Sequence, residues 1–126
     1  MLNLTTSSKI FVYTPVTDMR KGVHGLSGIV RGEFKADPTD GSLFVFINRR
    51  RDRMKILYFD GGGFWLYYRV LEAGTFEELK SPKNPDQSSY LTIDATELSM
   101  LLSGVSLVAS TRRRKRYAKS QTERAA

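Results

Sequence analysis

The spacing of apolar residues predicts a β-sheet in the middle of the chain. Runs rich in β-branched and aromatic residues occur at 43–48, 53–59 and 64–71. Four-residue separators at 49–52 and 60–63 join them, and the second separator contains three glycines. Strand-like runs connected by such short loops form hairpins. We therefore predict an antiparallel meander made of two successive hairpins.

The register set by these loops gives the meander two faces that are both largely apolar. One face carries Phe44, Phe46, Lys55, Leu57, Phe59, Phe64, Leu66, Tyr68 and Val70, and the other carries Leu43, Val45, Ile47, Met54, Ile56, Tyr58, Trp65, Tyr67 and Arg69. An antiparallel sheet exposed to water on one side normally has one polar face. Both faces therefore need a cover. Two predicted helices can cover one face, and the chain's ends, a second subunit or a ligand would cover the other.

A strand and a helix are expected before the meander. Residues 10–13 are apolar and bounded by Lys9 and Thr14-Pro15, which favours a short strand. Thr17 or Asp18 is a suitable N-cap. An apolar stripe at helical spacing then follows, formed by Met19, Val23, Leu26, Val30 and Phe34. Glycines at 22, 25, 28 and 32 each cost about 1 kcal/mol in a helix, so we expect tertiary support and the close approach of another backbone segment.

Residues after the meander predict a second strand–helix pair. Before the meander, residues 37–41 have the composition of a turn. After it, a short further strand is expected at 75–79, and 80–89 has the composition of an irregular polar loop. A last strand is expected at 90–93. Asp94 and Glu97 then have capping-box spacing, ahead of an apolar face of Leu98, Leu101, Leu102 and Val105 that Gly104 ends. The fold class is α+β: an antiparallel meander of three to five strands with one helix before it and one after.

The charge is concentrated at the C-terminal end. The chain has 126 residues, 20 Lys+Arg and 13 Asp+Glu, for a formal charge of +7. Residues 112–124 hold seven basic residues and one acidic residue, so nearly all of the excess lies there. We predict a single domain over 1–109 and a basic disordered arm over 110–126.

Composition excludes several kinds of site. The chain has no cysteine and a single histidine, His24, which excludes disulfides, thiol nucleophiles and sites that need two imidazoles. The residues suggest no catalytic group, no metal site and no cofactor. No apolar run approaches the ~20 residues of a membrane span, and residues 1–9 lack the pattern of a signal peptide. We expect a cytoplasmic protein without membrane contact.

Three stretches together resemble a known family. They are TDMRKG at 17–22 with Gly25-Leu26; LFVFINRRRDRMKILYFD at 43–60, continuing through GFWLYY at 63–68 to LEAGTF at 71–76; and Leu98 with LLSG at 101–104. From about residue 8 to about residue 107, the chain is similar to the small accessory protein, often called TnpB, of the insertion-sequence family numbered sixty-six. The resemblance implies a non-catalytic helper of DNA transposition in a bacterial mobile element, with the chemistry carried out by a separate transposase. Two features depart from the family: Glu77-Glu78-Leu79 stands where Trp-Pro is usual, and the Arg-rich tail is more extreme.

Basic residues are the candidate nucleic-acid contacts. Arg49, Arg50, Arg51 and Arg53 crowd one predicted hairpin loop with Lys55 beside it, and guanidinium groups bind phosphate oxygens through forked donors. The alternative is a solvated loop of weak ion pairs. Arg20 and Lys21 would contact phosphate or pair with Asp60 or Glu72. The tail residues Arg112, Arg113, Arg114, Lys115 and Arg116 would bind DNA without sequence preference, or only make the terminus soluble.

Aromatic residues on one predicted strand give a second hypothesis. Trp65, Tyr67 and Arg69 alternate along it, with Tyr58 alongside. Buried, they would be core. Exposed, they would stack nucleic-acid bases or form a partner interface, and the interface is preferred because Trp, Tyr and Arg dominate interface hot spots. The first hypothesis is therefore an accessory protein of transposition that binds DNA phosphates through the hairpin loop and tail. The alternative is a module that binds the transposase, or a second copy of itself, through the aromatic face.

Overall fold

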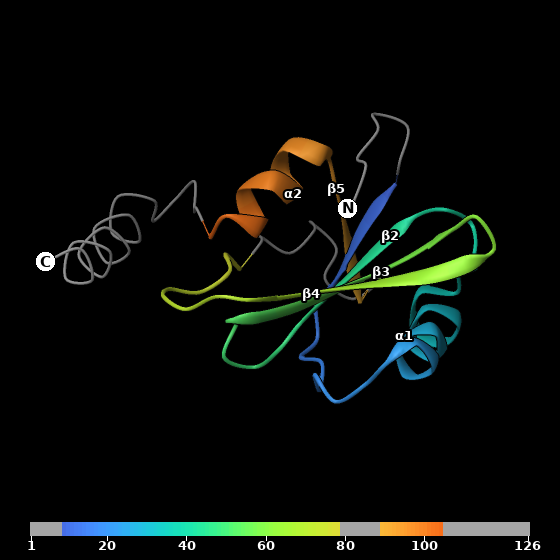
Figure 1. Cartoon of the computed structure of the whole chain (residues 1–126), viewed down its shortest axis with the longest axis horizontal. Helices are drawn as coiled ribbons and strands as arrows, with labels where there is room; N and C mark the ends of the chain where they lie inside the picture. The colour runs from blue at the N-terminus through green and yellow to red at the C-terminus, as the bar shows by residue number, and fades with distance from the viewer. Residues whose placement is uncertain (1–8, 79–88, 105–126) are drawn as a thin grey trace, which may run out of the picture.

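Five strands form one mixed sheet in the order β4-β3-β2-β1-β5, with a helix on each side (Figure 1). The structure is a computed structural model that describes residues 9–78 and 89–104. The strands are β1 (Ile10–Tyr13), β2 (Leu43–Ile47), β3 (Arg53–Asp60), β4 (Gly63–Val70) and β5 (Tyr90–Ile93), and the helices are α1 (Val23–Ile29), the π-helical segment η1 (Val30–Phe34) and α2 (Ala95–Leu102). The α+β class is confirmed.

The central meander has the predicted register. β2 pairs antiparallel with β3, and β3 pairs antiparallel with β4. Leu57 lies between Phe44 and Leu66, and Ile56 lies between Val45 and Tyr67, so the division into two faces is confirmed. The second hairpin is tighter than predicted, because Asp60 pairs with Gly63. Its two turn residues, Gly61 and Gly62, have φ of 59° and 85°, which glycine adopts without steric cost.

The sheet is mixed because the chain crosses from β1 to β2 through a helix. β1 pairs parallel with β2, with Ile10 opposite Leu43. Parallel neighbours need such a crossover connection, and α1 with η1 supplies it. β5 then adds antiparallel to the other side of β1, with Ile10 opposite Ile93. The short strands predicted at 10–13 and 90–93 are both confirmed.

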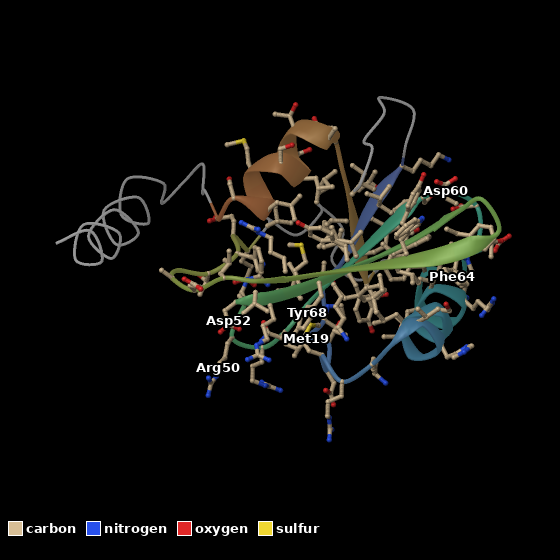
Figure 2. All side chains as sticks on the ribbon, viewed as in Figure 1. Met19, Arg50, Asp52, Asp60, Phe64 and Tyr68 are labelled. Carbon is tan, nitrogen blue, oxygen red and sulfur yellow. The ribbon has the colours of Figure 1, made fainter. Side chains whose placement is uncertain are left out.

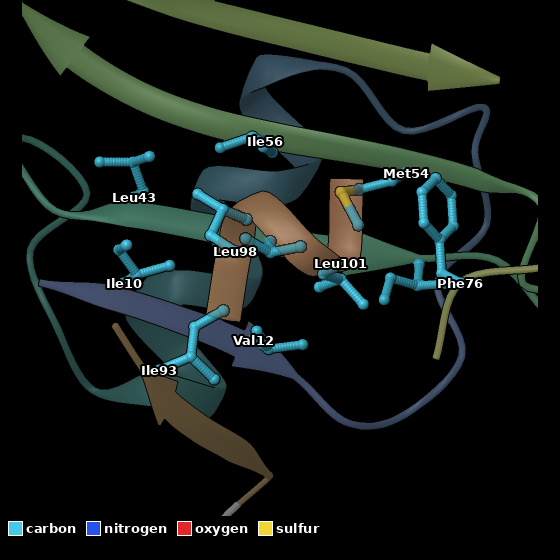
Figure 3. Packing of buried hydrophobic residues seen from close by; sticks show 11 residues of the cluster. Ile10, Val12, Leu43, Met54, Ile56, Phe76, Ile93, Leu98 and Leu101 are labelled. Atoms are coloured by element: carbon cyan, nitrogen blue, oxygen red, sulfur yellow. The ribbon is translucent and has the colours of Figure 1, made fainter. Parts of the chain in front are cut away.

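The two helices cover opposite faces of the sheet rather than the same face. In Figure 1, α2 lies above the sheet and α1 lies below it. Leu98 and Leu101 of α2 pack with Ile10, Ile56 and Phe76 (Figure 3). On the other face, the helical side chains Leu26, Val30 and Phe34 pack against the sheet residues Phe44, Phe46 and Leu57. Each apolar face of the sheet thus has its own helical cover.

The first helix begins later than the sequence predicts. Gly22 is its N-cap and makes no side-chain capping bond, so the prediction that Thr17 or Asp18 caps it is wrong. Met19 precedes the helix but still packs with its apolar cluster. The sequence also predicted that another backbone segment would lie close to the glycines of this helix, and in the described part of the chain none does. A Cβ placed on Gly22, Gly28 or Gly32 would meet no atom within 4 Å, and one on Gly25 would meet only the side chain of Lys21.

The elements after β4 follow the prediction in part. The described residues of the strand expected at 75–79 are irregular, so no strand forms there. Phe76 instead turns its side chain fully into the core and donates its N–H to the carbonyl of Arg51. Asp94 and Glu97 form the predicted capping box, and Gly104 has a φ of 75° just after α2.

Three sequence expectations fall outside the described residues. They are Val105 on the face of the second helix, nearly all of the 80–89 loop, and the tail from 110 with its domain boundary. Within the described residues, the helices are too short to cross a membrane.

Candidate nucleic-acid interface

The loop between β2 and β3 is held in one shape by Asn48. Its Oδ1 accepts hydrogen bonds from the backbone N–H groups of Asp52 and Arg53 at 3.1 and 3.0 Å, and its Nδ2 donates to Asp52 Oδ1 at 2.8 Å. The Asn48 carbonyl accepts from the N–H of Arg51. These bonds close the loop on itself. Arg49 and Arg50 are thereby exposed to solvent, and Figure 2 shows Arg50 at the tip of the loop.

The segment that joins β1 to α1 runs beside this loop. The N–H of Thr17 donates to the carbonyl of Ile47 at 3.0 Å. Lys55 of β3 donates from Nζ to the carbonyls of Met19 and Lys21 at 2.7 and 2.8 Å, and its ammonium lies 5.1 Å from the centre of the Tyr68 ring. Only 9% of Lys55 is exposed. The ammonium of Lys55 therefore fastens this segment to the sheet and faces away from solvent.

A cleft of about 610 Å³ lies between the loop and the segment. Its lining residues are Val16, Thr17, Asp18, Met19, Asn48, Arg49, Arg50, Asp52 and Arg53. Arg49, Arg50 and Arg53 are exposed, and the Nη1 of Arg53 donates to the hydroxyl of Tyr68 at 3.3 Å. The structure thus brings three of the four predicted loop arginines to one concave surface.

Both carboxylates of the cleft are already hydrogen-bonded. Asp52 accepts from Asn48, as described, and Asp18 accepts from the guanidinium and the backbone N–H of Arg20. The hydrogen bonds from Arg20 lower the pKa of Asp18 to about 2. The ion-pair partner of Arg20 is therefore Asp18 and not Asp60 or Glu72. Lys21 is exposed next to this pair, and its carbonyl accepts from Lys55.

The fourth loop arginine, Arg51, faces the protein. Its Nε donates to the carbonyl of Phe76 at 3.1 Å and its Nη2 donates to the carbonyl of Glu77. Its backbone has a φ of 58°, in the left-handed region. Arg51 thus anchors the segment that follows β4 and does not line the cleft.

The aromatic residues of β4 lie on the surface. Trp65 and Tyr67 are 58% and 38% exposed, so the interpretation of these two side chains as core is wrong. Tyr58 is half-buried against the core of that face. Arg69 is also half-buried, and its Nε donates to the carbonyl of Leu102 at 2.6 Å, which places a cation at the C-terminal end of α2.

The sequence contained a signal for two of these inward-facing cations, Lys55 and Arg69, because each shares a predicted face with apolar residues that need a cover. Lys55 shares its predicted face with Phe44, Phe46 and Leu57, so the cover on that face also covers Lys55. Nothing in the run 49–53 separates Arg51 from its neighbours. The tail residues predicted to bind DNA, Arg112 to Arg116, lie outside the described residues. Among the residues that are described, no three metal-ligating side chains gather in one place.

Comparison with known proteins identifies a family over most of the chain. The family model described as IS66 Orf2 like protein matches residues 8–112. Two curated relatives come from Sinorhizobium fredii (strain NBRC 101917 / NGR234). "Uncharacterized protein y4jC" is 33% identical over 105 residues, covering 83% of this chain and 86% of the relative. "Uncharacterized protein y4hO" is 32% identical over 105 residues, covering 83% and 87%. No solved structure matches the chain.

Proposed function

The chain belongs to the IS66 Orf2-like family, whose members are accessory proteins of transposition, and from this membership we propose that it assists a separate transposase by binding DNA phosphates. The proposal assigns the contact to the cleft arginines Arg49, Arg50 and Arg53, with Lys21 at its border. The protein itself performs no chemistry. Its task is to attach to the DNA on which the transposase acts.

The observation that carries the proposal is the convergence of exposed guanidinium groups, which form no ion pair with a described residue, on a loop closed by hydrogen bonds of Asn48. Arg49 and Arg50 form no ion pair with a described residue, whereas both carboxylates of the same cleft are engaged by other groups. Forked guanidinium donors suit the oxygens of a phosphate. A loop closed by Asn48 loses little conformational freedom on binding, so more of the interaction energy appears as affinity.

The test is the salt dependence of binding to labelled duplex DNA, measured by fluorescence anisotropy with the full chain. Each phosphate contact contributes about 0.9 to the slope of log affinity against log salt concentration. Replacing both Arg49 and Arg50 by Gln should weaken binding and flatten the slope by about 2. The proposal fails if the full chain binds no DNA at low salt.

A matched control separates the position of the charges from their number. Lys9 and Arg31 are exposed and do not line the cleft. Replacing both by Gln removes the same formal charge and should leave the slope unchanged. If both double variants lost the same DNA affinity, binding would depend on overall charge, and the assignment of the contact to the loop would be wrong. Replacing the five basic residues at 112–116 by Gln in the full chain measures how much of the DNA affinity comes from the predicted basic tail.

A second candidate function is favoured by the exposure of Trp65 and Tyr67. Large aromatic side chains at the surface are typical of protein interfaces. In this alternative the chain is a protein-interaction module. Its test is co-purification of the transposase with the chain and with a Trp65→Thr/Tyr67→Thr variant. Retention by the first and loss by the second would support it.

A further inference from the structure

Within the described part of the chain, β4 presents an unpaired edge along its full length. β3 pairs with one edge of β4, and no strand among the described residues pairs with the other. The N–H of Leu71 donates to the carbonyl of Asp52 at 2.8 Å. In an antiparallel ladder, successive residues point their backbone N–H and C=O groups alternately toward one neighbouring strand and toward the other side. The odd-numbered residues of β4 therefore bond to β3, and Phe64, Leu66, Tyr68 and Val70 aim their backbone groups outward.

Both faces of the sheet are uncovered at β4. The exposed fractions are 58% for Trp65 and 38% for Tyr67 on the α2 side, and 46% for Tyr68 and 49% for Val70 on the α1 side. A partner that docked on one face would leave the other face in water. A strand added to the edge would extend both faces together and shield all four side chains.

Most features that normally protect an edge strand are missing from β4, whose one charged residue, Arg69, is bonded to the carbonyl of Leu102. Natural edge strands are short, bulged, or carry proline or inward-pointing charge. β4 has eight residues in continuous register with β3 and contains neither proline nor lysine. The opposite edge of the sheet, β5, has only four residues. β4 is thus built as a pairing surface.

We propose that β4 pairs antiparallel with β4 of a second copy of the chain, about a twofold axis at Leu66, so that one sheet runs through both copies. The inference rests on the second candidate function, for which it names the partner, and it requires no DNA contact. A twofold interface of this kind is closed and does not propagate into fibres.

The sequence of β4 is complementary to itself in this register. On the α2 side, Trp65 lies opposite Tyr67 of the second copy at a non-hydrogen-bonded position, where cross-strand side chains are closest. On the α1 side, Leu66 lies opposite its own counterpart, and Phe64 lies opposite Tyr68 of the second copy. Each apolar side chain therefore meets an apolar side chain, and the outward-facing backbone groups of Phe64, Leu66 and Tyr68 find partners.

Charge complementarity also favours the antiparallel arrangement. Asp60 lies at the opposite end of the β3–β4 hairpin from Arg50 and the basic loop (Figure 2). In the proposed register, Arg69 faces Gly63 of the second copy, and the strand neighbour of Gly63 is Asp60. Arg69, which donates its Nε to Leu102 in its own copy, and Asp60 of the second copy thus place opposite charges on the same face at each end of the interface. Parallel pairing would instead bring the two basic loops together.

The test is the mass of the full chain by sedimentation equilibrium, in enough salt that nucleic acid does not bridge copies. Wild type should be a dimer. Trp65→Thr/Tyr67→Thr keeps strand propensity while removing the aromatic pairs, and it should be a monomer. Leu66→Pro removes an outward N–H together with a side chain that packs on the α1-side core, and it should also be a monomer. Val16→Thr, which alters an exposed apolar residue that is not part of β4, should remain a dimer. Circular dichroism checks that each variant is folded.

Cysteine variants test the register, since the chain has no cysteine of its own. Opposed hydrogen-bonded residues have Cα atoms about 5.5 Å apart, within disulfide range. Oxidised Leu66→Cys should therefore form a covalent dimer, and Val16→Cys should not. A monomeric wild type overturns the inference, even if the transposase still binds through Trp65, and so does a dimer that survives both β4 variants. If the Arg49/Arg50 variant lost DNA binding but remained a dimer, the proposed β4–β4 pairing would be supported independently of the DNA contact.

Discussion

Lys55 of β3 donates a hydrogen bond of 2.7 Å to the backbone carbonyl of Met19, and its second bond goes to the carbonyl of Lys21. Hydrogen bonds to a charged group contribute about 1.5–3 kcal/mol each. We predict that Lys55→Met lowers the free energy of unfolding by about 3 kcal/mol or more, the low end of two such bonds, in urea denaturation. The same change should leave the salt slope of DNA binding as it is in wild type.

An exposed neighbour provides the control for Lys55. Arg53→Met removes a cation of the cleft whose guanidinium bonds, among the described residues, only to the Tyr68 hydroxyl. Stability should therefore change by less than about 1 kcal/mol, while the salt slope falls by about 0.9. The opposite pattern, with a flatter slope for Lys55→Met, would make Lys55 a phosphate contact after all.

Arg51 and Arg50 are adjacent in sequence and should differ sharply in effect. Arg51→Ala removes the donors to the carbonyls of Phe76 and Glu77, and we expect a loss of about 2–3 kcal/mol in the free energy of unfolding. Arg50→Ala alters an exposed side chain and should cost under about 0.5 kcal/mol. Thermal and urea denaturation of the two variants measure the difference. Equal stabilities would mean that the anchor at Arg51 contributes nothing.

The hydrogen bonds from Arg20 to Asp18 have a consequence for titration. The pKa of Asp18 lies at about 2, below its ordinary value of 3.8, so its carboxylate favours the folded state above pH ~4, and this contribution is lost as the pH falls toward 2. Arg20→Gln should move the pKa of Asp18 back toward the ordinary value. Carboxyl carbon shifts followed by NMR during acid titration report it. An unchanged midpoint would show that Arg20 is not the cause.

The sequence predicted most of the sheet because alternation and short loops act locally. Residues 43–71 contain both hairpin loops and all three strands, so their register follows from nearby residues alone. The pairing of β1 with β2 and the separation of the helices onto two faces depend on contacts distant in sequence, such as Ile10 with Leu43. The same limit applies to the cleft. Its second wall comes from residues 16–19. Arg51 leaves the cleft to its neighbours because the carbonyls of Phe76 and Glu77 accept its guanidinium.

The glycines of the first helix lower its intrinsic stability, and at Gly28 no close packing contact requires a glycine. Gly28 lies inside α1, its φ is outside the left-handed region, and a Cβ there would meet nothing within 4 Å. We therefore predict that Gly28→Ala stabilises the fold by about 0.5–1 kcal/mol, by restricting the unfolded chain and favouring helix.

Gly62 provides the matched contrast for Gly28. A Cβ there would also meet no neighbouring atom, but the φ of Gly62 is 85°. Gly62→Ala should therefore destabilise the protein, because the side chain strains the hairpin turn. Urea denaturation of the two variants separates the effects. If Gly28→Ala also lowered stability, open space around the glycine would not be the deciding factor, and α1 would have a requirement for glycine that its packing does not explain.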